Sequence, residues 1–346
     1  MNGTCVDKIL VSTEECATGM RLMQSIIDER TGTTIVARGQ ILNDEHISKL
    51  KNFKHTEIWV RIEEESSFWN VASTTIEEYK NYASILKRIF CVQAKDFSYV
   101  ELNQLRELSK MIVKNFKSDY DALGCMGLLS SLDKNIYYHS INVALLALLV
   151  GRWMEYDSEK IENLVMTSLL HDVGKLKINP SLYNKREEEM DVLEKLEYRR
   201  HTIYGYEMLV TYNELDNEIL KGVLSHHECI DGSGYPLCVD GEYLNEFARV
   251  IGIVDTFDRL KEKYHIFKTI RHLGSIRFKK FDPKILLPFC HNVVNYYIGC
   301  KVLLSNGKIG EIAFIQPKAL YRPIVRVGKQ EINLYEHPSI EIVKVF

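Results

Sequence analysis

The spacing of hydrophobic positions separates a long helical middle from two shorter ends. From about residue 75 to residue 295, apolar residues recur every three or four positions, the period of an α-helix with one buried face. This spacing predicts helices over residues 76–90, 100–116, 135–153 and 159–171. Segment 135–153 is strongly apolar, so we expect a buried helix there.

The helix predicted over 159–171 has signals at both ends. Asp157 and Ser158 can each cap its N-terminus, and Glu159 suits the first turn because a negative charge is favourable there. Gly174 is placed to stop the helix.

Short β-rich segments replace the helical pattern toward the N-terminus. Gly32 and Gly39 mark turns between them, and Asn43 or Asp44 can cap a short helix. The predicted elements are strands over 33–36 and 57–62 and a helix over 43–51.

The C-terminal part also has the pattern of a small β domain. Asn306 and Gly307 together predict a hairpin turn between two of its strands. The predicted strands are residues 300–304, 309–315, 324–327 and 340–345.

These changes of pattern predict a multi-domain fold, in which an all-α domain is flanked by a small α+β module and a small β domain. Segment 63–73 is acidic and polar, as expected of a linker. The predicted parts are the α+β module 1–62, a linker with leading helices 63–114, the all-α domain 115–295 and the β domain 296–346.

Composition narrows the possible partners and compartment. The net charge of −3 gives no global basic field for a long nucleic acid. No apolar run approaches the roughly 20 residues that a bilayer requires, and the N-terminus lacks the pattern of a signal peptide, so we expect a cytoplasmic protein without a membrane span. The eight cysteines include no CxxC pair, which argues against a zinc finger.

Histidines and aspartates gather in five segments of the helical middle: YYHSINVA, HDVGK, HTIYG, HHECIDGSGYP and GIVDTFD. Neutral imidazole together with carboxylate suits transition metals such as iron, manganese or zinc. Helices of a bundle can direct such side chains into one shared core. The candidate ligands are His139, His171, Asp172, His201, His226, His227 and Asp255.

Adjacent ligands suit a site with two metals. Neighbouring side chains on one backbone point in different directions, so the pairs His171–Asp172 and His226–His227 can each serve two ions, and an aspartate can bridge both. Two ions about 3.5–4 Å apart activate a shared water as hydroxide and hold phosphate oxygens during in-line displacement. A single histidine on an apolar helix is more often a core residue, but the ordered combination of HDVGK and HHExxDGxGYP favours a site.

These motifs resemble the HD-GYP domain, a subgroup of the HD phosphohydrolase superfamily, over roughly residues 115–290. The resemblance implies an all-α HD-type helical bundle that hydrolyses the bacterial second messenger cyclic di-GMP to linear pGpG or GMP, with two or three metals, usually iron or manganese. It implies all seven candidates as ligands, Asp172 as the bridging catalytic residue and Lys175 as the catalytic group that neutralises phosphate charge. The substrate contacts that we expect are Lys175, Asp231, Gly234, Tyr235, Lys261 and Lys263. The N- and C-terminal parts resemble modules that accompany such domains.

Two departures from the family pattern change the expectation. Some members have a metal-recruiting glutamate where this chain has Asn135, so we expect two metals rather than three. The family usually continues DALTSxRPYR where this chain has DRLKEKYH from Asp258 onward. Arg259, Lys261 or Lys263 could replace the missing charge, although a lysine cannot form the bidentate fork of an arginine.

Three hypotheses follow from the sequence. The first is a cyclic di-GMP phosphodiesterase that uses a metal-activated hydroxide, alone, as a homodimer or with a partner signalling protein. The second is a phosphodiesterase for another cyclic dinucleotide, such as 3′,3′-cyclic GMP-AMP, or for another phosphoester. The third is a catalytically weak sensor or scaffold, against which the intact HDVGK and HHE motifs argue.

Overall fold

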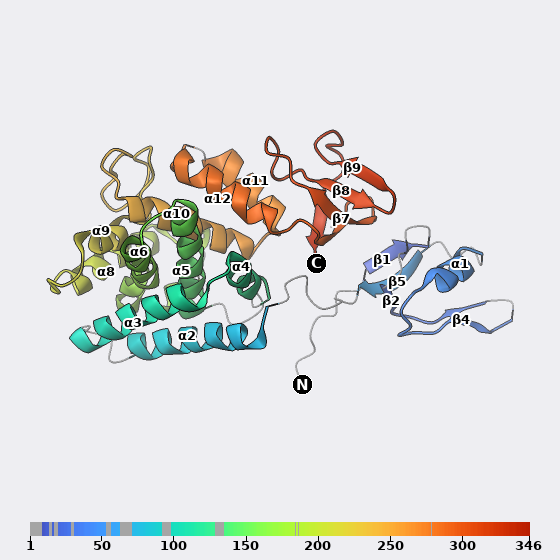
Figure 1. The fold of residues 1–346 in the computed structure, drawn as a ribbon, viewed down its shortest axis with the longest axis horizontal. Coiled ribbons are helices and arrows are strands. Elements are labelled where there is room, and N and C mark those ends of the chain that lie inside the picture. The colour runs from blue at the N-terminus through green and yellow to red at the C-terminus, as the bar shows by residue number, and fades with distance from the viewer. Residues whose placement is uncertain are drawn as a thin grey trace. The chain divides into compact units, whose positions relative to one another are not determined.

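The computed structural model describes residues 9–13, 16, 20–28, 31–52, 57–62, 71–91, 98–128, 135–183, 185, 187–277 and 279–346. The chain divides into two compact units, each considered by itself below (Figure 1). One unit is Trp69–Tyr296, and the other combines the preceding N-terminal part with Tyr297–Phe346. None of the described helices combines the length and apolar character that a bilayer-spanning segment needs.

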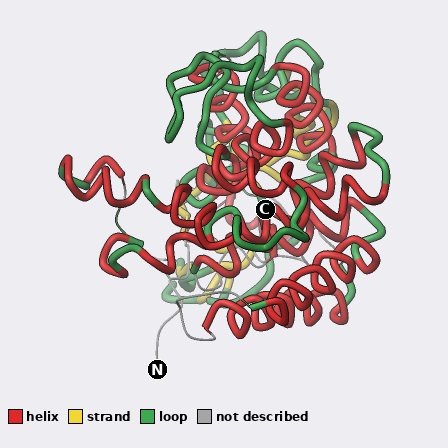
Figure 2. Tube along the Cα trace, turned by 90° about the vertical axis from the view of Figure 1, so that its left-hand side faces the viewer, coloured by secondary structure: helices red, strands yellow, loops and turns green. Residues whose placement is uncertain are grey.

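The unit Trp69–Tyr296 is built from helices joined by loops (Figure 2). Its α-helices are α2 Ser73–Cys91, α3 Tyr99–Asn115, α4 Asp119–Leu128, α5 Ile136–Trp153, α6 Ser158–Leu170, α7 Val192–Arg199, α8 His201–Leu209, α9 Asn217–Ser225, α10 Glu246–Lys261, α11 Ile266–Arg277 and α12 Pro283–Asn295. Its 3₁₀ segments are η1 Val173–Lys177, η2 Pro180–Leu182 and η3 Glu187–Glu189.

Helix α5 lies at the centre of this unit, as its apolar sequence predicts. It packs against α2, α4, α6, α10 and α12, and every residue from Val143 to Gly151 is buried. Its N-terminus is capped by Asn135, whose side chain accepts hydrogen bonds from the backbone N–H groups of Tyr137 and Tyr138. The buried body of the helix anchors its half-buried first turn, which carries His139.

Helix α6 begins as predicted but does not end as predicted. The Asp157 side chain caps it by accepting from Lys160 N at 2.8 Å. The prediction that Gly174 stops the helix is wrong, because α6 ends at Leu170 and Gly174 lies inside η1. A Cβ on Gly174 would lie 1.9 Å from the carbonyl oxygen of His201, so this glycine permits close packing of η1 against α8.

The N-terminal part has the mixed character that its sequence predicts. Gly32 and Gly39 adopt positive φ angles of 70° and 86° at the predicted turns. The predicted linker over 63–73 ends too late because α2 already begins at Ser73; residues 63–70 lie outside the described residues. The elements are β1 Ile9–Ser12, β2 Met20–Leu22, β3 Ile26–Ile27, β4 Thr34–Val36, α1 Asp44–Asn52 and β5 Glu57–Ile62, with an antiparallel sheet in the order β1-β5-β2.

The C-terminal part is an antiparallel sheet in the order β10-β6-β7-β8-β9. Gly307 has a φ of 82° in the predicted hairpin turn, and Leu303 pairs with Ile309 across it. The strands are β6 Lys301–Leu304, β7 Ile309–Phe314, β8 Ile324–Val327, β9 Gln330–Asn333 and β10 Ile342–Val345. The polar strand β9 was not predicted, because its sequence QEIN lacks an apolar run.

Candidate metal centre

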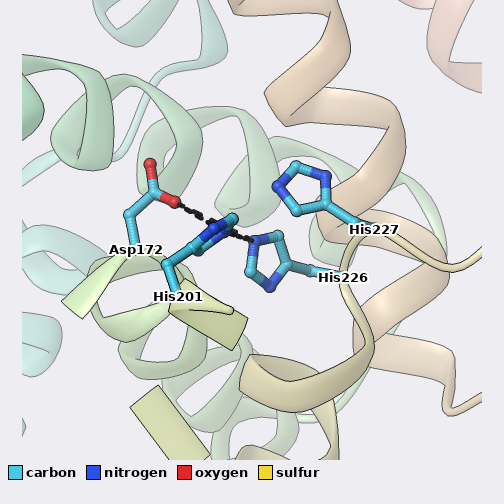
Figure 3. A group of neighbouring side chains, drawn as sticks. All are labelled: Asp172, His201, His226 and His227. Carbon is cyan, nitrogen blue, oxygen red and sulfur yellow. Dashed lines mark hydrogen bonds and ion pairs between the residues drawn. The ribbon is translucent and has the colours of Figure 1, made fainter. Parts of the chain in front are cut away.

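The seven candidate ligands come together in two neighbouring groups within the helical unit. In each group, one possible ligand atom from every residue lies within 4.8 Å of the others. Figure 3 shows the larger group, with three imidazole rings converging beside one carboxylate. The larger group is Asp172, His201, His226 and His227, and the smaller group is His139, His171 and Asp255.

Three of the histidines are oriented in the same way, by a hydrogen bond to a backbone carbonyl at the end of a helix. The Nδ1 atom of each lies within hydrogen-bond distance of the carbonyl oxygen three residues earlier: 2.6 Å for His171, 2.6 Å for His201 and 2.8 Å for His226. A carbonyl oxygen only accepts, so Nδ1 carries the proton and donates it. Each Nε2 therefore directs a lone pair toward the cluster. A histidine that binds a metal through Nε2 needs this tautomer.

Asp172 lies between the two groups. Its Oδ1 atom is 3.4 Å from His201 Nε2 and 4.0 Å from His226 Nε2. Its Oδ2 atom is 3.3 Å from His171 Nε2 and 3.8 Å from His139 Nε2. The two oxygens thus face different groups, as required of a carboxylate that bridges two cations.

Unpaired buried atoms show that the residues fit a cation. Among the described side chains, His171 Nε2, Asp172 Oδ1 and His227 Nε2 are buried without a hydrogen-bond partner. The Nε2 atoms of His201 and His226 lie 3.4 Å apart, and both present lone pairs (Figure 3). Buried acceptors that face each other are unfavourable unless a cation satisfies them, and imidazole with carboxylate suits a transition metal.

The protonation states of the larger group suit the binding of a cation. Burial lowers the pKa of His201 to about 4 and holds the pKa values of His226 and His227 well below their usual range, so all three rings are neutral near pH 7. Burial opposes ionisation of Asp172, but Lys175, His171 and Arg259 together outweigh it and hold the pKa of the carboxyl well below its usual range. The group thus offers three neutral nitrogens and one carboxylate.

The smaller group is arranged differently, because His139 lies between two carboxylates. Its Nδ1 is 2.8 Å from Asp258 Oδ2, and its Nε2 is 2.9 Å from Asp255 Oδ1. Burial and the charge of Arg259 oppose protonation of His139, but the bonds to Asp255 and Asp258 prevail and raise its pKa to about 9. Asp258 therefore fixes the ring while Nε2 faces the cluster.

Comparison with known proteins identifies the helical region. Residues 124–285 match the family model described as HD domain. This segment is similar to HD domains. The resemblance predicted from the motifs is thereby confirmed, and so is the helical HD-type core of the predicted fold.

Three curated relatives are similar to this chain. It is 28% identical over 205 residues to the cyclic di-GMP phosphodiesterase PA4108 of Pseudomonas aeruginosa, over 58% of this chain and 49% of that protein. It is 24% identical over 355 residues to the cyclic di-GMP phosphodiesterase PdeB of Borreliella burgdorferi, over 98% of this chain and 88% of that protein. It is 33% identical over 193 residues to the 3′3′-cGAMP-specific phosphodiesterase 2 of Vibrio cholerae, over 53% of this chain and 34% of that protein.

The chain thus spans about half the length of PA4108, but most of PdeB. A solved structure, Bd1817, an HDG"Y"P protein from Bdellovibrio bacteriovorus, superposes with a TM-score of 0.56 at 17% identity. The match covers 84% of this chain and 100% of that one, and it supports the fold.

Two predicted substrate contacts lie against the ligand groups. Lys175 Nζ is 2.5 Å from Asp172 Oδ2 and 5.2 Å from the centre of the Tyr198 ring. The Tyr235 ring packs on His227 with centroids 4.8 Å apart. Both side chains therefore lie next to candidate metal ligands.

Gly234 has a structural reason to be glycine. A Cβ there would lie 2.3 Å from Glu228 Cα and 2.5 Å from Cys229 N. The loop that carries Tyr235 packs directly on the backbone after His227, so a side chain at residue 234 would push the loop away.

The other predicted contacts lie apart from the ligands. Asp231 is exposed and accepts hydrogen bonds from Ser233, and Lys261 lies over the Phe257 ring with its pKa lowered by burial. Lys263 is exposed. Within the described part of the chain, no side-chain bond joins any of the three to the ligand groups, so their role stays a prediction.

Two further residues contribute more to the site than the sequence indicated. Glu228 is buried, and its Oε1 accepts hydrogen bonds from the backbone N–H groups of Leu237 and Cys238 at 2.5 and 3.0 Å. These bonds hold the loop after Tyr235 in place. Arg259 Nε is 2.7 Å from Asp255 Oδ1. The signal for Arg259 is its spacing of four residues from Asp255, which puts both on one helix face.

Proposed function

We propose that this protein is a metal-dependent phosphodiesterase that hydrolyses a cyclic dinucleotide, with cyclic di-GMP as the first candidate and linear pGpG or GMP as product. The observation that carries the proposal is Asp172, whose two oxygens face two groups of histidine and carboxylate ligands that include unpaired buried atoms. The substrate class is supported by the names of PA4108 and PdeB.

Each ligand group would hold one ion. The larger group would use its three Nε2 atoms and Asp172 Oδ1, and the smaller group His139, His171, Asp255 and Asp172 Oδ2. When bound, divalent ions, for which we propose iron or manganese, activate a water and hold phosphate oxygens.

The protein's own groups orient this chemistry. The carbonyl oxygens behind His171, His201 and His226 fix the ring planes, so the ligand directions exist before metal or substrate arrives. Lys175 is a compact ammonium beside Asp172 and can donate to a phosphate oxygen held there. Neutralising negative charge at that oxygen should lower the free energy of the transition state, in which the phosphorus is crowded, more than that of the ground state.

Two metals are proposed rather than three. The Asn135 side-chain oxygen already accepts two backbone N–H groups at the start of α5, at 3.0 and 3.1 Å. An amide engaged as a helix cap is a weak candidate for a third ligand position.

A second candidate substrate is 3′,3′-cyclic GMP-AMP. It is favoured by the Vibrio cholerae relative and by the segment after Asp258, where Arg259 replaces the apolar start of the family pattern. A change in the positive groups near the cluster can alter the preference between dinucleotides without loss of hydrolysis.

The proposal is tested by anaerobic purification, elemental analysis and chromatography of products from cyclic di-GMP and 3′,3′-cyclic GMP-AMP. We expect about two iron or manganese ions per chain and a linear product from at least one of them. The double variant His171→Ala, Asp172→Ala should form no product, whereas His291→Ala, at an exposed histidine of α12, should match the wild type.

Three outcomes would contradict the proposal in different ways. Product formation by the double variant would exclude this centre as the active site. Absence of metal after anaerobic reconstitution would exclude the ligand assignment. Bound metals with tight dinucleotide binding but no turnover would identify a sensor instead of an enzyme.

A further inference from the structure

A positive charge of the protein lies against the smaller ligand group. Arg259 Nε is 2.7 Å from Asp255 Oδ1, and its Nη2 is 3.3 Å from both His139 Nε2 and Asp172 Oδ2. These are the same oxygen and nitrogen atoms that a cation bound to His139, His171 and Asp255 would use. The guanidinium and a metal ion therefore compete for one set of atoms.

The competition follows from the spacing of residues along helix α10. Arg259 follows Asp255 by four residues, so the two side chains share a face of the helix. A guanidinium stays protonated in proteins, so the arginine is a permanent cation.

The arginine also has room to move. Its side chain is 39% exposed, whereas that of Asp255 is 3% exposed. The guanidinium can swing outward while the carboxylate remains in place, so the group can accept a metal after the bonds to Arg259 are broken.

The larger ligand group has no such competitor. Among the described residues, no lysine or arginine nitrogen bonds to Asp172 Oδ1, His201, His226 or His227. Lys175 and Arg259 both bind Asp172 through Oδ2, the oxygen that faces the smaller group. The two groups therefore differ in the charge that an incoming metal meets.

We propose that Arg259 makes the two metal subsites unequal, so that the larger group binds its ion tightly and the smaller group binds its ion only when the guanidinium is displaced. Arg259 is a positioning residue that sets metal occupancy. The inference rests on the metal centre of the proposed function, but it concerns affinity rather than hydrolysis.

The test is anaerobic calorimetric titration of the metal-free full chain with Mn²⁺, together with electron paramagnetic resonance to detect coupled ion pairs. The wild type should show one tight and one weak site. Arg259→Met keeps most of the side-chain volume without the charge and should tighten the weak site by at least about tenfold, because a like charge at contact distance is removed. Arg259→Lys should lie between them.

Lys268→Met is the control. It removes one positive charge from the following helix, α11, at an exposed residue that lies over Tyr264 rather than on the ligands, so both affinities should stay as in the wild type. Circular dichroism and thermal unfolding of each variant will show that the fold is intact.

The outcomes separate the inference from the proposed function. Two equally tight sites in the wild type, or an unchanged weak site in Arg259→Met, would overturn the role of Arg259 without contradicting the proposed two-metal enzyme. Equal tightening in Lys268→Met would show a general charge effect and also overturn the role of Arg259. Absence of Mn²⁺ binding in the wild type and in every variant would contradict the proposed metal centre itself.

Discussion

At the scale of single residues, the centre depends on which imidazole nitrogen carries the proton. His171, His201 and His226 each donate Nδ1–H to a carbonyl oxygen of the preceding turn, at 2.6, 2.6 and 2.8 Å. The backbone thereby selects the tautomer with a free Nε2 before any ligand arrives. For His139, a carboxylate of Asp258 takes the place of the carbonyl.

Replacing Lys175 should lower turnover without loss of metal. Replacing it by glutamine removes the ammonium 2.5 Å from Asp172 Oδ2, while all seven ligands remain. We expect kcat to fall by about 10²-fold or more, as for removal of one preorganised charge donor. Steady-state kinetics with elemental analysis measures both effects.

The control for this variant is Lys177→Gln, an exposed lysine of the same 3₁₀ segment, which should behave as the wild type. A wild-type kcat in Lys175→Gln, or a loss of metal together with activity, would show that the lysine does not act on the substrate.

At the scale of elements, the distance between Asp172 and His201 is set by a close contact of η1 with α8. Asp172 directly precedes η1, and His201 opens α8. Gly174 lies against the backbone of both His201 and Gly205, where a Cβ would come within 1.9 and 2.4 Å. The two elements approach this closely only because Gly174 has no side chain.

Gly174→Ala should therefore disturb both stability and metal binding. The methyl group would collide with backbone atoms that cannot move aside, so we expect a loss of about 1–3 kcal/mol or more in the free energy of unfolding. Weaker metal binding should accompany it, because His201 would shift away from Asp172. Urea unfolding and metal titration measure the two effects.

The comparison variant is Gly151→Ala in α5, where the nearest atom to the new Cβ is a side-chain carbon of Ile161 at 3.0 Å. The gain in helix propensity, about 1 kcal/mol, should offset that contact. Equal stability of the two variants would show that the contact of η1 with α8 is not constrained by Gly174.

At the scale of the whole molecule, every candidate ligand belongs to one compact unit, Trp69–Tyr296. The second unit contains the sheets built by the N-terminal part and by Tyr297–Phe346. A metal that binds only the native helical unit stabilises that unit through mass action and leaves the other unit unaffected.

Differential scanning calorimetry should therefore resolve separate transitions for the two units. Saturation with Mn²⁺ at about 100 times its dissociation constant should stabilise one transition by about 2.7 kcal/mol, and chelation should reverse the change. The double variant His171→Ala, Asp172→Ala should lose the shift. A single transition, or a metal-dependent shift of both, would contradict independent units.

The sequence by itself determined the local features of this protein. Helix α5 was predictable because its apolar residues leave no polar face, and α6 because Asp157 caps it. The hairpin at Gly307 followed from its turn residues. The seven candidate ligands were identified because their motifs are contiguous and ordered. Strands β1, β2, β3 and β9 escaped prediction, since short or polar strands depend on their neighbours for stability.

Only the tertiary structure decided which atoms face one another. The bond from His139 to Asp258 joins residues 119 positions apart, and no local pattern encodes such a distance. The two faces of the Asp172 carboxylate, the glycine contact between η1 and α8 and the placement of Arg259 against the smaller ligand group all arise from packing between elements. Periodicity shows which face of a helix is buried, whereas the crossing of helices determines what that face meets.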